Sequence, residues 1–201
     1  MRWTLVGRFR DETGHAVAPG DLLRHAPRAF AEAVARVTVG WAPAAPLIGY
    51  SARRVIEREV LTAGCRIVEF GSGRSTPWFA ARCGWLLSIE DDPVWYARVE
   101  RWLGSGAEHV RHELRAGSRA YTDLSDVRDG SVDFALVDGR WRDSCVAAVV
   151  PKIRPGGAVY LDNSDTEAAA ARLQAAATRV RRFTDFAPTH FFVEQGMLAW
   201  F

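Results

Sequence analysis

The residues best suited to chemistry lie in a short glycine-rich segment. Gly71, Ser72 and Gly73 follow an apolar run that carries one acid, Glu69. Glycines at the end of a strand let the chain turn tightly and let a ligand lie against bare backbone near the next helix. A second acid, Glu90, follows about 20 residues later, where a carboxylate can bind both hydroxyls of a ribose. The spacing predicts a ligand that contains a ribose.

Two cofactors compete for this turn. The nicotinamide dinucleotide fingerprint requires a third small residue where this chain has Thr76. A pyrophosphate at the helix start would also be repelled by Glu69, whereas S-adenosylmethionine has no phosphate and carries a positive sulfonium. Charge favours S-adenosylmethionine, with a nicotinamide-dependent oxidoreductase as the alternative.

Two further acids end apolar runs later in the chain. Asp138 follows residues 132–137, and Asp162 with Asn163 follows residues 158–161. In open α/β sheets, ligands lie outside the carboxyl ends of the strands. We therefore expect these side chains near the glycine-rich turn, although Asp138 could instead cap the helix that follows it.

The elements that would position these residues alternate from residue 66 onward. Strands are predicted over 66–70, 85–89, 109–114, 132–137 and 158–161, with helices between them, which indicates a parallel sheet covered on both faces. After a helix over 165–178, two strand-like runs at 180–186 and 191–201 suit an antiparallel hairpin. Helices over 20–37 and 50–61 form a cap. We expect a doubly wound α/β fold with a mostly parallel seven-stranded sheet, a C-terminal antiparallel hairpin and an N-terminal helical cap (residues 1–63) that belongs to the same domain as the core (residues 64–201).

Glu69, Gly71, Gly73, Glu90 and the terminal hairpin together resemble the class I S-adenosylmethionine-dependent methyltransferases. The resemblance implies that the first turn lies under the methionine part of the cofactor, that Glu90 holds the ribose and that the segment after the third strand flanks adenine. The implied cofactor-binding residues are Glu69, Gly71, Ser72, Gly73, Ser75, Thr76, Glu90, Asp91, Gly117, Ser118 and Asp138.

Methyl transfer is a direct displacement that needs a base only when the nucleophile arrives protonated. Asp138 and Asp162 are the predicted catalytic residues. With Asn163 they also resemble the magnesium site of catechol-type O-methyltransferases, since hard oxygen ligands suit such a cation. The lysine of those enzymes is Trp141 here, so no metal ligand is assigned, and magnesium is an alternative that is not favoured.

The acceptor side of the cleft has weaker signals. Trp41, Tyr50, Trp141 and His190 lie in segments expected to border it, and Arg140 and Arg142 could grip an anionic acceptor. Packing of the aromatic residues in the core is an equally good interpretation.

Composition narrows the function classes. The 201 residues carry a net charge of +2, and the arginines are scattered along the chain, so no nucleic-acid or membrane partner is expected. The three cysteines form no CxxC pair, and no apolar run has the length of a signal peptide or a membrane span. We expect a cytoplasmic methyltransferase that acts on a small molecule, with oxygen as the acceptor atom; a non-catalytic cofactor-binding scaffold is the alternative.

Overall fold

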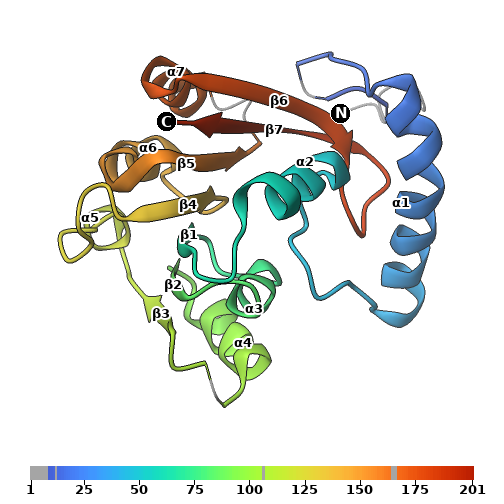
Figure 1. Ribbon diagram of the computed structural model, residues 1–201. Coiled ribbons are helices and arrows are strands. Elements are labelled where there is room, and N and C mark those ends of the chain that lie inside the picture. The colour runs from blue at the N-terminus through green and yellow to red at the C-terminus, as the bar shows by residue number, and fades with distance from the viewer. Residues whose placement is uncertain (1–8, 12, 106, 164–166) are drawn as a thin grey trace.

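A computed structural model of the chain describes residues 9–11, 13–105, 107–163 and 167–201 (Figure 1). The elements in chain order are α1 (Pro19–Val39), α2 (Tyr50–Val55), a π-helical turn (Ile56–Val60), β1 (Arg66–Phe70), α3 (Ser75–Ala80), β2 (Trp85–Glu90), α4 (Pro93–Leu103), β3 (Val110–Leu114), α5 (Ser118–Tyr121), β4 (Val132–Val137), α6 (Arg142–Val149), a 3₁₀ turn (Val150–Lys152), β5 (Ile153–Asp162), α7 (Glu167–Ala176), β6 (Arg179–Phe186) and β7 (Val193–Trp200).

The seven strands form one sheet in the order β3-β2-β1-β4-β5-β7-β6. Strands β1 to β5 pair in parallel, and β7 runs antiparallel to both β5 and β6. The predicted fold class is confirmed. Because β1 and β4 are neighbours although β2 and β3 lie between them in sequence, the strand order reverses at this pair. That reversal opens the crevice in which open α/β sheets bind their ligands.

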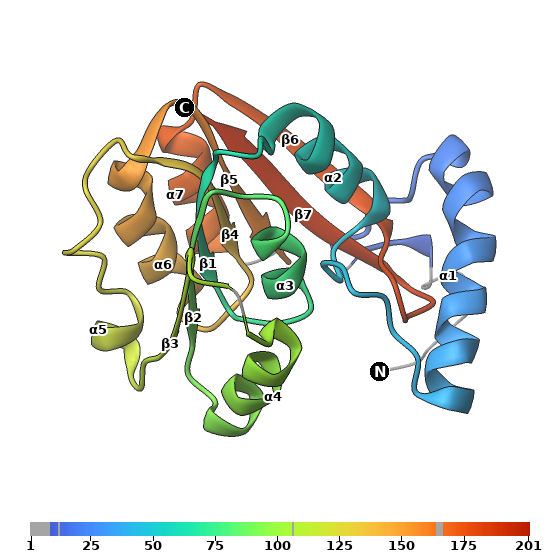
Figure 2. The same cartoon turned by 60° about the horizontal axis from the view of Figure 1, so that its bottom comes forward.

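Helices cover both faces of the sheet, and Figure 2 shows it nearly edge-on between them. Successive side chains of a strand point to opposite faces. Thus Ile67 packs in the cluster beneath α2 and α3, whereas Val68 and Phe70 pack in the cluster beneath α5, α6 and α7. Two-sided burial explains why β1 reads as an almost continuous apolar run. Glu69 is a charged side chain in the buried part of this strand and faces the protein interior.

Strand β5 differs from its prediction. It begins at Ile153 rather than at residue 158, and the Pro155-Gly156-Gly157 turn lies within it. Ile153 pairs with Val132 before the register shifts, so the extra residues bulge out of the ladder. Gly156 adopts φ +79°, which a glycine accommodates at this bulge.

The first two helices lie at the far end of the terminal hairpin. Helix α1 packs against β6 and stands apart from the other helices in Figures 1 and 2. The predicted helix over 50–61 is present but ends as a π-helical turn. The predicted start of α7 at Asp165 lies outside the described residues. Within the described part of the chain, no helix combines the length and apolarity that crossing a bilayer requires.

Candidate active site

A cavity of about 490 Å³ opens at the carboxyl ends of β1, β2 and β4. Parallel strands bring their ends to one sheet edge, so residues far apart in sequence meet there. The cavity is lined by Arg36, Leu47, Gly71, Ser72, Gly73, Arg74, Ser75, Glu90, Asp91, Trp95, Tyr121, Asp138, Gly139 and Arg140. Seven of the predicted site residues are part of this lining: Gly71, Ser72, Gly73, Ser75, Glu90, Asp91 and Asp138.

The glycine-rich turn makes a close approach to the loop after β4. Gly71 has φ +91°, and a Cβ there would lie 2.8 Å from the backbone nitrogen of Gly139. At Gly139, a Cβ would lie 1.9 Å from the Tyr121 hydroxyl. Gly73 is different, since its nearest neighbour would be the Ser75 hydroxyl at 3.6 Å. Gly71 and Gly139 are thus required by packing, whereas Gly73 leaves backbone open to the cavity.

Glu69 does not line the cavity. It is fully buried beneath the turn, where the hydroxyls of Thr76 and Ser88 donate hydrogen bonds to its Oε2 at 2.7 and 2.5 Å. Thr76 in turn accepts a bond from the Gly73 backbone N–H at 2.9 Å. Burial raises the pKa of Glu69 to about 7. The geometry assigns Glu69 and Thr76 to holding the turn in shape rather than to touching a ligand.

Glu90 is held rigidly on the cavity wall. The Ser72 hydroxyl donates to its Oε2 at 3.0 Å, and the backbone N–H groups of Asp91 and Asp92 donate to its Oε1 at 2.9 and 3.0 Å. The side chain is 6% exposed. A carboxylate fixed in this way keeps lone pairs available to accept hydrogen bonds from a pair of hydroxyl groups.

The predicted adenine segment lies elsewhere. Gly117 and Ser118 line a separate depression formed by residues 116–120 and Asp123, so the structure does not bring them into the cavity. Their position follows from α5, which begins at Ser118 and turns Tyr121 toward the cavity instead. The sequence of the segment around Gly117 and Ser118 gave no indication of which of its residues would face the cavity.

Trp95 and Tyr121 are cavity residues that the sequence did not single out. The Trp95 indole N–H donates to the Ser72 carbonyl at 2.6 Å, and its ring therefore borders the turn. The Tyr121 hydroxyl is buried with no hydrogen-bond partner among the described residues. The position of Trp95 on the first turns of the helix after Glu90 was the available signal.

Asp138, which follows β4, and Asp162, which ends β5, are neighbouring acids, and the pKa values of both are raised. Burial raises the pKa of Asp162 well above its usual range, and the nearby Asp138 charge adds to that effect. Asp138 keeps 39% of its side chain exposed, yet the surrounding protein atoms also raise its pKa. Two adjacent carboxyl groups whose pKa values both rise hold a proton more readily than either would alone. Asp162 is buried and does not line the cavity; it faces the cavity only through Asp138.

Arg142 lies among these strand ends. Its guanidinium donates to Asp138 Oδ1 at 3.2 Å, to Asn163 Oδ1 at 3.1 Å and to the Asp162 backbone carbonyl. It also donates to the Gly139 carbonyl at 3.1 Å. The planar guanidinium thus ties the loop after β4 to the end of β5, a role that the sequence did not indicate.

The same contacts test whether a divalent cation fits. Magnesium would need oxygens of Asp138, Asp162 and Asn163 as ligands. The guanidinium of Arg142 already bonds to two of these side chains, and its charge would repel a metal ion at that place. The residues therefore do not fit a resident magnesium ion.

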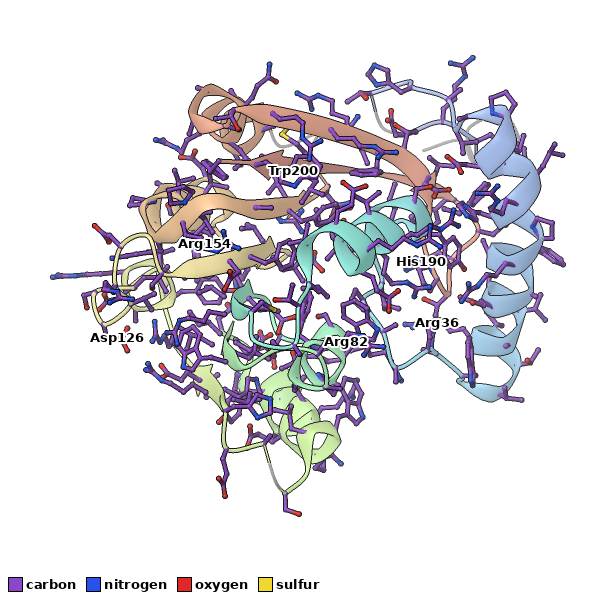
Figure 3. The ribbon with its side chains drawn as sticks, in the orientation of Figure 1. Arg36, Arg82, Asp126, Arg154, His190 and Trp200 are labelled. Carbon is purple, nitrogen blue, oxygen red and sulfur yellow. The ribbon has the colours of Figure 1, made fainter. Side chains whose placement is uncertain are left out.

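The structure places only some of the residues expected at the acceptor side on the cavity wall. Tyr50 is buried between α1 and α2, and Trp141 packs on Tyr121 and the core, so neither lines the cavity. Arg140 does line it and pairs with Asp91 at 3.1 Å across the opening. His190 stacks on Phe192 and lies beside Arg36 in Figure 3.

Comparisons with protein-family models and with curated proteins give no match. Among solved structures, an rRNA methylase from Streptococcus thermophilus matches with a TM-score of 0.58 at 12% identity over 77% of this chain and 98% of that one. A SAM-dependent O-methyltransferase from Thermotoga maritima matches with a TM-score of 0.58 at 13% identity, over 84% and 71%. A tRNA methyltransferase from Aquifex aeolicus matches with a TM-score of 0.56 at 16% identity, over 77% and 70%. The chain has the class I S-adenosylmethionine-dependent methyltransferase fold.

These findings correct one expectation. The sequence predicted no nucleic-acid partner, but an rRNA methylase and a tRNA methyltransferase share this fold, so the exclusion is wrong. The physical reason is that scattered arginines in a sequence do not show where the fold gathers them.

Proposed function

We propose that the protein is an S-adenosylmethionine-dependent methyltransferase that methylates a hydroxyl oxygen. The observation that carries the proposal is the Glu90 carboxylate, fixed on the cavity wall beside the open backbone of Gly73. The class I methyltransferase fold supports the same cofactor. Glu90 would bind the two ribose hydroxyls, and the Gly71–Gly73 backbone would lie under the methionine part.

The acid pair suits a nucleophile that arrives protonated. Bound S-adenosylmethionine would supply an electrophilic methyl group, and an alcohol or phenol attacking it must lose its proton. Asp138 faces the cavity and could accept that proton, with Asp162 behind it and Arg142 stabilising the charged form. The raised pKa of Asp138 makes it a better proton acceptor than an ordinary carboxylate. We further propose that Arg142 takes the part of a cation, so that no divalent metal is required.

The strand order disfavours the oxidoreductase alternative. Nicotinamide-binding sheets have the parallel order 3-2-1-4-5-6. Here the antiparallel β7 lies between β5 and β6. A non-catalytic scaffold with the same fold would keep the Glu90 site and lack turnover, so binding and transfer must be measured separately.

Calorimetric titration with S-adenosylhomocysteine tests the cofactor. We expect binding that weakens at least about tenfold, or roughly 1.4 kcal/mol, in Glu90→Gln. Glu113→Gln is the matched control, because Glu113 lies near the end of the neighbouring strand β3, pairs with Arg111 and is absent from the cavity lining. Absence of binding by the folded wild type would overturn the proposal.

Transfer of a labelled methyl group from S-adenosylmethionine then tests the activity. The acceptor panel should include phenols, sugars and RNA, each with and without a chelator. A cofactor that binds with no transfer to any of these classes would favour the scaffold.

A further inference from the structure

Five arginines converge on a second cavity, of about 340 Å³, between α1 and α2. We call it the arginine pocket; it is lined by Arg24, His25, Arg28, Tyr50, Arg53, Arg54, Glu57 and Arg58. On α1, Arg24 and Arg28 are four residues apart, and so are Arg54 and Arg58 beyond the start of α2. Residues four apart share one face of a helix, so both helices present guanidinium groups to the same space.

Most of this positive charge has no carboxylate partner. Arg28 pairs with Glu32 at 2.7 Å. The only acid in the lining is Glu57, which lies 3.6 Å from Arg82 outside the pocket. Within the described part of the chain, no ion pair at 4.0 Å or less involves Arg24, Arg53 or Arg58.

The floor of the pocket is built from buried hydrogen bonds. Arg54 donates to His25 Nε2 at 3.1 Å, and His25 Nδ1 bonds to Asp185 of β6 at 2.9 Å. His25 is 2% exposed and Asp185 1%. Tyr50 donates to Glu32 at 2.8 Å. These contacts fix α1 on α2 and β6, so the guanidinium groups above them are held close together.

Holding like charges together has a cost. Burial lowers the pKa of the Arg53 guanidinium, and the nearby Arg28 charge lowers it further. A bound anion between these groups would stabilise the positive charge of Arg53 and offset its repulsion from Arg28. Phosphate suits such a site because planar guanidinium groups bind its oxygens with paired, charge-assisted hydrogen bonds.

Helix α1 contributes residues to both the arginine pocket and the cofactor cavity. Arg24, Arg28 and Arg36 recur at multiples of four residues along that helix, and Arg36 lines the cofactor cavity. A rise of 1.5 Å per residue separates Arg24 from Arg36 by about 18 Å along the axis. Figure 3 shows Arg36 pointing from α1 toward the body of the molecule.

We propose that the arginine pocket binds a phosphate group of the methyl acceptor. The phosphate would belong either to a small phosphorylated molecule or to a nucleic-acid backbone, and both present the same oxygens. The link to the acceptor rests on the proposed methyltransferase function, whereas the phosphate site itself depends only on the five arginines.

Binding of inorganic pyrophosphate to the full chain tests the proposal, with saturating S-adenosylhomocysteine present to fill the first cavity. We expect the affinity to fall at least tenfold in Arg53→Gln and in the double variant Arg24→Gln/Arg58→Gln. Both residues of the double variant are solvent-accessible and make no ion pair with described residues, so it should fold normally by circular dichroism. Arg128→Gln is the matched control, because Arg128 is exposed and outside the pocket.

Competition identifies the source of the phosphate. Displacement of pyrophosphate by a twelve-nucleotide RNA indicates a nucleic-acid backbone, and displacement by ribose 5-phosphate alone indicates a small molecule. Pyrophosphate that does not bind, or that binds equally to the pocket variants, overturns the proposal even if S-adenosylhomocysteine binds normally. A third outcome separates the two proposals. If pyrophosphate binding depends on the arginines but S-adenosylhomocysteine does not bind in the absence of pyrophosphate, the proposed methyltransferase function is overturned and the phosphate site is supported.

Discussion

Two groups of acids lie along the same edge of the sheet, and they differ in the groups that surround and hold them. Glu69 lies within β1 and Glu90 ends β2, and both are held by hydroxyl or backbone N–H donors that carry no net charge. Asp138, which follows β4, accepts a bond from the Arg142 guanidinium through its carboxylate, whereas Asp162, which ends β5, accepts one through its backbone carbonyl. Neutral donors add no counter-charge to a carboxylate, whereas a guanidinium balances its charge within the protein. In the first group, Glu90 faces the cavity and is arranged for binding a ligand, while Glu69 supports the turn. Under the proposed function, the second group is arranged for exchanging a proton.

The two groups meet where Gly71 touches Gly139, and a side chain there should have the largest effect. Gly139→Ala places a Cβ against Tyr121 and Gly71. We expect a loss of about 3 kcal/mol of stability and of S-adenosylhomocysteine binding, measured by thermal unfolding and calorimetry. Gly73→Ala is the control for stability, because its Cβ would be in ordinary contact at 3.6 Å. Equal stability of the two variants would refute the close packing of this junction.

Removing Arg142 should affect only the second group. Arg142→Ala leaves the Asp138 carboxylate without its ion-pair partner and removes a nearby positive charge from Asp162, at a cost of about 2–3 kcal/mol, reduced because Asp138 is partly exposed. The vacated place should then accept Mn²⁺, seen by electron paramagnetic resonance. The wild type and Arg140→Ala, whose arginine is 70% exposed, should not bind it. Wild-type Mn²⁺ binding that disappears in Asp138→Asn would contradict the cationic role of Arg142.

Glu69 gives the smallest effect and a distinct dependence on pH. Its pKa is raised to about 7 in the folded protein, so the folded state binds the proton more tightly than the unfolded state. Its stabilising contribution is present below about pH 4.5 and is lost as the pH rises toward 7. Glu69→Gln should therefore gain about 2 kcal/mol over the wild type between pH 4.5 and pH 8, after the cost of an unpaired amide hydrogen. Thermal unfolding at a series of pH values measures it, and a pH-independent difference would exclude a raised pKa.

The sequence was sufficient for the first group of acids because its structure is local. Residues 66–90 contain a strand, a turn, a helix and a strand whose spacing alone brings Glu90 beside Gly73. The role of Glu69 was not evident, because only the folded chain shows that its side chain turns away from the cavity toward Thr76 and Ser88. Strand identity was likewise predictable from apolar runs, while the bulge in β5 depends on pairing with β4.

Contacts between distant segments could not be predicted in this way. Arg142 bonds to Asn163 because β4 and β5 are neighbours in the sheet. The sequence around Arg142 indicated only the start of a helix. The arginine pocket forms because buried bonds from His25 bring two helices together. The i, i+4 spacing of arginines on both helices was visible in the sequence, but nothing in it indicated that the two faces would meet.

The antiparallel β7 has a consequence for the order in which the chain can fold. Residues 193–200 come after every other strand in sequence, yet they lie between β5 and β6 and are the strand neighbour through which β6 joins the sheet. During synthesis from the N-terminus, β1 to β5 can pair while β6 has no strand beside it. The sheet edge at β5 stays open until β7 emerges from the ribosome. Helix α1, made first, obtains its docking surface on β6 last.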